Sequence, residues 1–160
     1  MLKNIAIAFI LFLVHPMAVL GLDDPSTREE VGEFFDSYLG AFAARDENLL
    51  SEQYFVAPMY LRTGNEILLL ESKESVIAHL STVFSDLSIQ NYSRTEIATK
   101  STCVLTDDAV IVSVVLRRYS SEGVVLLESG ASYSIVKLGG SWRVTMASVH
   151  TPEKVVSCET

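Results

Sequence analysis

The last third of the chain, Ala109 to His150, constrains the fold most strongly. Three runs of alternating apolar and polar residues are separated by two short turn sequences, centred on Ser121-Glu122 and on Gly139-Gly140. Alternation of this kind predicts three consecutive antiparallel strands. If both turns are two-residue loops, symmetry about each turn fixes which residues pair and which share a face.

One face of this predicted sheet is largely apolar and is expected to pack against helices. Its members are Val110, Val112, Val114, Leu116, Leu127, Ser129, Ala131, Tyr133, Ile135, Trp142, Val144, Met146, Ser148 and His150. The polar members gather at one end, which predicts a core at one end of the sheet and a pocket mouth at the other. The opposite face mixes polar and β-forming residues, so it is either an exposed face or the contact of a homodimer. A one-residue change of register would exchange the two faces.

The first half of the chain predicts helices and a short hairpin. Apolar residues recur at helical spacing after Pro25, Asp46 begins a short second helix, and Ser72 caps a third. Between them, residues 56–62 read as an edge strand because Pro58 argues against a central one. The fold class is therefore α+β, with three N-terminal helices packed on a curved, mainly antiparallel sheet.

The N-terminus has the pattern of an export signal. Lys3 precedes an apolar run over residues 5–14, and small residues lead to Gly21. This order predicts a signal peptide over 1–21 and a periplasmic or secreted protein. A retained membrane anchor is the alternative, but the run is short for a spanning helix. The predicted division of the chain is a signal peptide at 1–21, a domain at 22–152 and a C-terminal tail at 153–160.

The charge excludes some partners. The formal charge of −8 becomes −9 once Lys3 is removed with the signal peptide. Such an acidic domain is not expected to bind nucleic acid or an anionic membrane surface. Neither a metal-ligand cluster nor a phosphate loop is evident, and no cofactor is expected.

Two cysteines, Cys103 and Cys158, follow the signal peptide. In an oxidising compartment they could form a disulfide that ties the tail to the sheet. The alternative is a buried thiol at Cys103 and a free thiol in the tail.

Three segments resemble the nuclear transport factor 2-like (NTF2-like) superfamily, in its SnoaL-like and ketosteroid-isomerase-like branch. They are residues 31–46, ending Ala43-Ala44-Arg45-Asp46, then Ser72-Lys73-Glu74-Ser75-Val76-Ile77, and Gly139-Gly140-Ser141-Trp142-Arg143-Val144. The resemblance implies a cone-shaped, cystatin-like fold that encloses an apolar pocket and is often dimeric.

The resemblance does not supply the isomerase catalytic set. Where the isomerases carry a carboxylate base, this chain has residues 57–62 without an acid, and the nearest is Glu66. Tyr38 matches the tyrosine of the first helix, but the predicted inner face holds no Asp or Glu. The base and oxyanion hole of that mechanism are therefore not carried over.

The predicted function is non-enzymatic binding of a small apolar ligand or a protein partner by an exported domain. The predicted pocket residues are Tyr38, Tyr60, Tyr133, Met146, Ser148 and His150. The alternative is a SnoaL-like isomerase, cyclase or hydrolase in which His150 is the base and Tyr38 or Tyr133 the proton donor. His150 could equally be satisfied by backbone or water, and the tyrosines could be core residues. His79 is predicted to lie on the surface.

Overall fold

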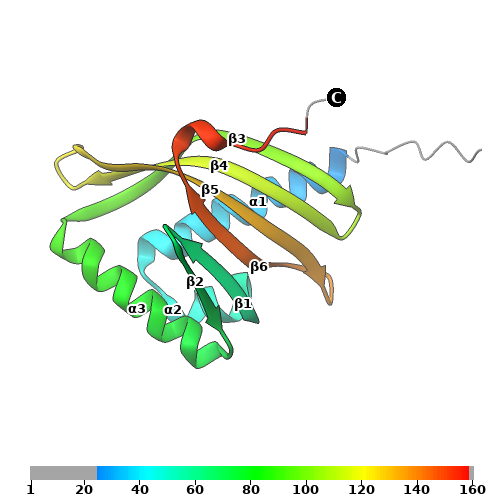
Figure 1. Ribbon diagram of the computed structural model, residues 1–160, viewed down its shortest axis with the longest axis horizontal. Helices are drawn as coiled ribbons and strands as arrows, with labels where there is room; N and C mark the ends of the chain where they lie inside the picture. The colour runs from blue at the N-terminus through cyan, green and yellow to red at the C-terminus, as the bar shows by residue number, and fades with distance from the viewer. Residues whose placement is uncertain (1–24, 159–160) are drawn as a thin grey trace, which may run out of the picture.

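The computed structural model describes residues 25–158, which form one sheet with helices packed against it (Figure 1). The elements are α1 (Pro25–Ala44), α2 (Glu47–Leu49), a π-helical turn (Leu50–Tyr54), β1 (Phe55–Thr63), β2 (Glu66–Leu70), α3 (Lys73–Ile89), β3 (Tyr92–Thr106), β4 (Ala109–Ser120), β5 (Val125–Leu138), β6 (Ser141–His150) and a 3-10 turn (Pro152–Lys154). The predicted signal peptide, residues 1–21, lies outside the described residues. Within the described range, no helix combines the length and the apolar character needed to cross a membrane.

The six strands follow the order β2-β1-β6-β5-β4-β3. All neighbours are antiparallel except β1 and β6, which are parallel. The prediction of β1 as an edge strand is wrong, because β2 is the edge and β1 lies between β2 and β6. Pro58 is tolerated there because the pairing of β1 with β6 shifts between Phe55 and Tyr60. A proline without an N–H fits where the ladder is already interrupted.

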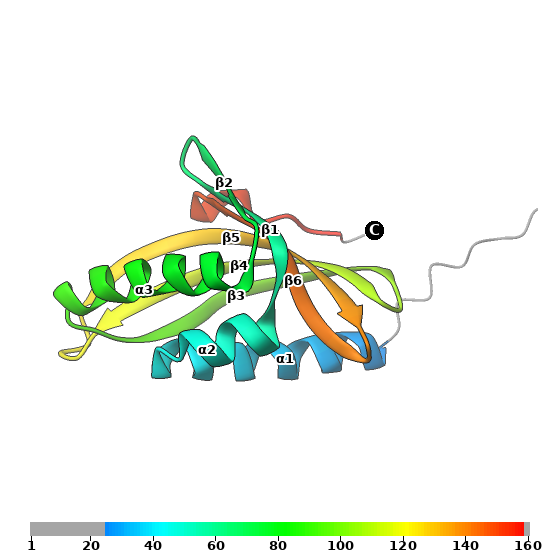
Figure 2. The same cartoon turned by 90° about the horizontal axis from the view of Figure 1, so that it is seen from below.

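The helices cover one face of the sheet, which we call the inner face. α1 buries Val31, Phe35 and Tyr38 at helical spacing, and α3 buries Val76 and Leu80 in the same way. The predicted helix starts at Asp46 and Ser72 are confirmed, because each side chain accepts a hydrogen bond from a backbone N–H of the first turn. Figure 2 shows α1 and α2 on one side of the sheet and the C-terminal segment on the other.

The β4–β5 hairpin differs from its predicted register by two residues. Leu116 pairs with Ser129 rather than with Leu127, because the loop after Ser120 is longer than two residues. A shift of two residues leaves every side chain on its predicted face. The inner face of β4 and β5 is therefore the one that the sequence predicts.

The β5–β6 hairpin begins in its predicted register and then departs from it by one residue. Leu138 faces Ser141 across the Gly-Gly turn and Ile135 faces Val144, both as predicted, but Ser134 faces Met146. Thr145 is thus an extra residue, a β-bulge, and a bulge exchanges the two faces of the strand beyond it. The predicted inner placement of Met146, Ser148 and His150 is wrong for this reason. Their side chains lie on the opposite, outer face, and Ala147 and Val149 line the inner one.

The chain after β6 crosses the outer face, and we call residues 151–158 the C-terminal strap. Its backbone N–H at Val156 donates to Ser113 Oγ at 3.0 Å, and a disulfide joins Cys158 to Cys103. Beneath the strap, serines face one another across four adjacent strands. These are Ser101 (β3), Ser113 (β4), Ser132 (β5) and Ser148 (β6). The small side chains leave room for the strap to lie against the sheet, and the disulfide is one of the two predicted cysteine arrangements.

Candidate ligand-binding cavity

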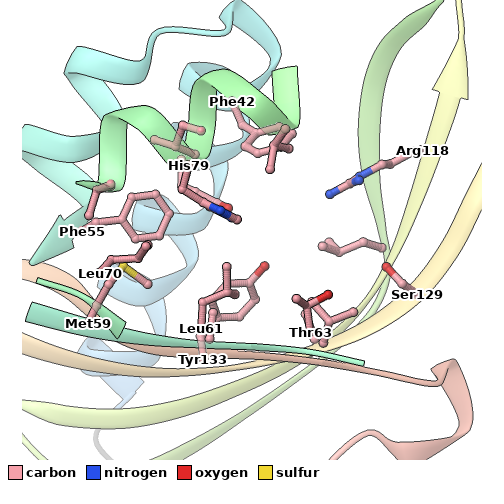
Figure 3. Close-up of a pocket in the computed structure, with 18 of the residues that line it drawn as sticks. Phe42, Phe55, Met59, Leu61, Thr63, Leu70, His79, Arg118, Ser129 and Tyr133 are labelled. Atoms are coloured by element: carbon pink, nitrogen blue, oxygen red, sulfur yellow. The ribbon is translucent and has the colours of Figure 1, made fainter. Parts of the chain in front are cut away.

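A cavity of about 300 Å³ lies between α1, α3 and the inner face of the sheet (Figure 3). Small-molecule sites typically measure about 300–1,000 Å³. Its apolar lining consists of Phe42, Phe55, Met59, Leu61, Leu70, Val76, Leu80, Val83, Leu116, Leu127, Ala131, Ala147 and Val149. The polar lining consists of Tyr38, Thr63, His79, Arg118, Ser129 and Tyr133, and no carboxylate from residues 25–158 joins it. No group of His, Cys, Asp and Glu in that range could hold a metal ion.

The cavity has a closed end and an open end. Phe55, Met59 and Leu70 are buried at the closed end, where the short strands meet α3. At the open end, Leu127 is 44% exposed and Val149 is 37% exposed. Arg118 pairs with Leu127 across β4 and β5, so its side chain belongs to the open end.

Two buried phenols face the cavity from α1 and β5. Burial raises the pKa of Tyr38 well above its ordinary value, and the adjacent Tyr133 raises it further. Burial also raises the pKa of Tyr133, although Tyr38 and Arg118 oppose that rise. Both hydroxyl groups are therefore protonated at neutral pH. Tyr133 points its oxygen into the cavity, where the hydroxyl can donate a hydrogen bond.

His79 points into the cavity from α3 (Figure 3). Its predicted surface position is therefore wrong. The signal was present in the sequence, because His79 lies three residues after Val76 and four before Val83, on the apolar stripe of the helix. Burial lowers the pKa of His79, so the ring is neutral at neutral pH.

Arg118 is the permanent charge of the cavity wall. Its Nε is buried and has no hydrogen-bond partner, and leaving a buried polar group unsatisfied costs about 1–3 kcal/mol. The guanidinium carbon lies 5.6 Å from the centroid of the Phe42 ring. The predicted inner face of β4 ends at Leu116, and continuing the same alternation by two residues reaches Arg118.

The structure brings together only part of the predicted pocket. Tyr38 and Tyr133 line the cavity. Tyr60, Met146, Ser148 and His150 lie on the outer face; Tyr60 is 53% exposed and Met146 44% exposed. Tyr60 pairs with Met146, so these two share the outer face across β1 and β6. Whether Tyr38 and Tyr133 bind a ligand stays a prediction.

His150 belongs to a hydrogen-bonded chain beneath the strap. Its Nδ1 lies 2.8 Å from the carbonyl oxygen of Thr151 and its Nε2 lies 3.0 Å from Ser132 Oγ. Ser132 Oγ lies 2.9 Å from Ser113 Oγ, which accepts from the Val156 N–H. Because a carbonyl only accepts, Nδ1 donates to Thr151, and Nε2 lies within hydrogen-bond distance of the Ser132 hydroxyl. His150 thus anchors the strap, and it does not face the cavity tyrosines.

This architecture defines a cone-type α+β protein: a curved sheet and three helices around an interior space of ligand size. Residues 28–152 match the family described as NTF2-like protein (DUF6841), and the chain belongs to that family. The predicted fold class and the resemblance to the NTF2-like superfamily are thereby confirmed.

Solved structures with low sequence identity share the fold. Aln2 from a Streptomyces species is 17% identical, with a TM-score of 0.67 over 81% of this chain and 94% of that one. An NTF2-like protein of unknown function from Shewanella oneidensis is 11% identical, with a TM-score of 0.64 over 77% and 98%. A putative scytalone dehydratase from Novosphingobium aromaticivorans is 13% identical, with a TM-score of 0.63 over 84% and 89%. No curated protein matches the sequence.

Proposed function

We propose that this protein binds a small, mostly apolar molecule in the cavity between α1, α3 and the sheet, without transforming it. The observation that carries the proposal is the cavity of about 300 Å³ with an apolar wall and, among residues 25–158, without a lining carboxylate. Burial of apolar ligand surface there would supply the binding energy, and the few polar groups would orient the ligand.

Native mass spectrometry of the protein purified from its source tests this proposal. We expect a retained small molecule that is released on denaturation. The variant Ala131→Phe, which fills the cavity from β5, is expected to purify without it. Met146→Phe is the matched control, because Met146 is exposed on the outer face and its replacement leaves the cavity unchanged. A ligand that Ala131→Phe still retains would contradict binding at this site.

We further propose that the protein is exported to the periplasm or secreted. The disulfide between Cys103 and Cys158 supports this, because such bonds persist in oxidising compartments. Fractionation of source cells, with N-terminal sequencing of the recovered protein, tests it. A start near residue 22 in the exported fraction is expected, and an intact residue 1 in the cytosol would contradict it.

A homodimer formed through the outer face is also proposed. The strap covers part of the outer face, and an apolar row remains beside it. Leu69, Tyr60 and Met146 lie side by side across β2, β1 and β6, and each is at least 44% exposed. A contiguous exposed apolar surface of this kind favours a protein contact, and the same patch on a second copy would complement it.

Acid–base catalysis is the second candidate, and it requires a different histidine from the one predicted. His150 lies on the wrong face, but neutral His79 and the protonated Tyr133 point into one cavity (Figure 3). A base and a proton donor across a cavity are what a dehydration needs. Because one fold neighbour is named a putative scytalone dehydratase, scytalone is the first substrate to test. Loss of water that depends on His79 would favour catalysis over binding.

A further inference from the structure

Arg118 presents unused hydrogen-bonding capacity to the cavity. Its Nε has no partner, and no carboxylate from residues 25–158 forms an ion pair with it. The contact with the Phe42 ring is electrostatic and uses no N–H. A guanidinium keeps its proton at any physiological pH, so the cavity wall carries a fixed positive charge.

We propose that the ligand of this cavity is a small amphipathic carboxylate whose carboxylate accepts hydrogen bonds from Arg118. This inference rests on the proposed binding function and names the ligand class. The Nε–H and one terminal N–H of a guanidinium form a fork that matches the two oxygens of a carboxylate. A ligand bound in this way satisfies the Nε that the protein itself leaves unpaired.

The layout of the cavity agrees with a ligand of this polarity. Arg118 and Ser129 lie toward the open end, and Figure 3 shows both beside the space that the other residues enclose. The closed end at Phe55 and Met59 is buried and apolar, so the body of the ligand would point there. The cavity volume of about 300 Å³ is at the lower end of the range for small-molecule sites, which favours a small ligand such as octanoate.

Titration calorimetry with matched acids and alcohols tests the inference. The probes are octanoate against 1-octanol, and 4-phenylbutyrate against 4-phenylbutanol. The apolar part is an alkyl chain in the first pair and carries a ring in the second, so the comparison does not depend on one apolar shape. We expect each acid to bind the protein about tenfold or more tightly than its alcohol, since hydrogen bonds to charged groups are the strong ones. Arg118→Met is expected to remove that preference while the affinity for the alcohols stays within about threefold.

The neighbouring arginine supplies the control. Arg117 lies on the outer face, paired with Glu128, and Arg117→Met is expected to leave all four affinities unchanged. If acids and alcohols bind equally and Arg118→Met changes neither, the carboxylate assignment is overturned while the binding function stands. If no probe binds and the purified protein retains no ligand, the binding function fails, and the assignment fails with it.

Discussion

At the scale of single residues, Gly130 is the glycine with the tightest surroundings among those described. It pairs with His150, and a Cβ added to it would lie 2.2 Å from His150 Nδ1 and 2.7 Å from the Thr151 carbonyl oxygen. An isolated glycine within a strand often marks such a close approach. This glycine is what allows the imidazole to lie against the sheet and hold the strap.

A pair of alanine variants tests this role. Gly130→Ala must displace the His150 ring, and we expect it to lower the free energy of unfolding by about 1–3 kcal/mol. Gly40→Ala is the control, because its Cβ would meet nothing within 4 Å on α1. There the loss of a helical glycine is expected to raise stability by about 0.5–1 kcal/mol. Urea unfolding measures both, and equal effects would contradict the packing argument.

His79 gives the cavity a predictable response to acid. Burial holds its folded-state pKa below the ordinary value of 6.5. The unfolded chain therefore binds a proton first as the pH falls, so stability is full above about pH 6.5 and declines below it. The titratable groups that share the cavity are Tyr38, Tyr133 and Arg118, none of which changes charge in this range.

The variant His79→Gln isolates that contribution. We expect the unfolding free energy of the wild type, relative to that of the variant, to fall as the pH is lowered from about 7.5 to about 5.5. Carboxylate titrations elsewhere affect both proteins alike and cancel in the comparison. Parallel pH profiles for the two proteins would show that the histidine is not desolvated.

At the scale of elements, the bulge at Thr145 decides what β6 presents to the cavity. Substitution by lysine of the two residues that follow it, one on each face of the strand, tests the register. Ala147 is buried on the inner face, and Ala147→Lys is expected to unfold the protein or cost several kcal/mol through burial of a charge. Met146→Lys places the charge on the outer face and, at a concentration at which the protein is monomeric, is expected to stay within about 0.5 kcal/mol of wild type. A continuous strand without the bulge would give the reverse order, which thermal unfolding distinguishes.

The C-terminal strap is a second element whose contribution can be measured. The disulfide closes a segment with a sequence separation of 55 residues. Bonds of this type typically stabilise by about 2–4 kcal/mol, mainly by restricting the unfolded chain. We expect Cys158→Ser to lower the unfolding free energy by about that amount. The addition of a reductant should destabilise the wild type and leave the variant unchanged.

At the scale of the whole molecule, the apolar row on the outer face governs the predicted association. Tyr60→Glu places a charge in the middle of that row, and the side chain of Tyr60 lies on the face of β1 opposite the cavity. We expect sedimentation equilibrium to show a dimer for the wild type and a monomer for this variant at micromolar concentration. A wild-type monomer under the same conditions would count against the homodimer.

The sequence predicts the α+β architecture well because periodicity and turns act over short distances. The stripes of α1 and α3, the Gly-Gly turn and the inner faces of β4 and β5 all follow from local pattern. The position of β1 inside the sheet could not be derived, because its parallel pairing with β6 joins segments far apart in the chain.

The candidate site could be predicted only in part. The helical spacing of α1 places Tyr38 correctly and the alternation of β5 places Tyr133 correctly, and both line the cavity. Thr145 carries no local signal of its bulge, so an error of one residue moved Met146, Ser148 and His150 to the wrong face. Arg118 and His79 could have been predicted. The alternation of β4 places Arg118 on the inner face, and the helical spacing of α3 places His79 on the apolar stripe.

The cross-link from Cys103 to Cys158 turns β4, β5 and β6 into parts of one covalent ring. A protease that cuts the exposed β4–β5 loop at Glu122 therefore produces two pieces that remain joined. The nicked protein therefore keeps its strands together. The cavity would then persist after the backbone has been cut.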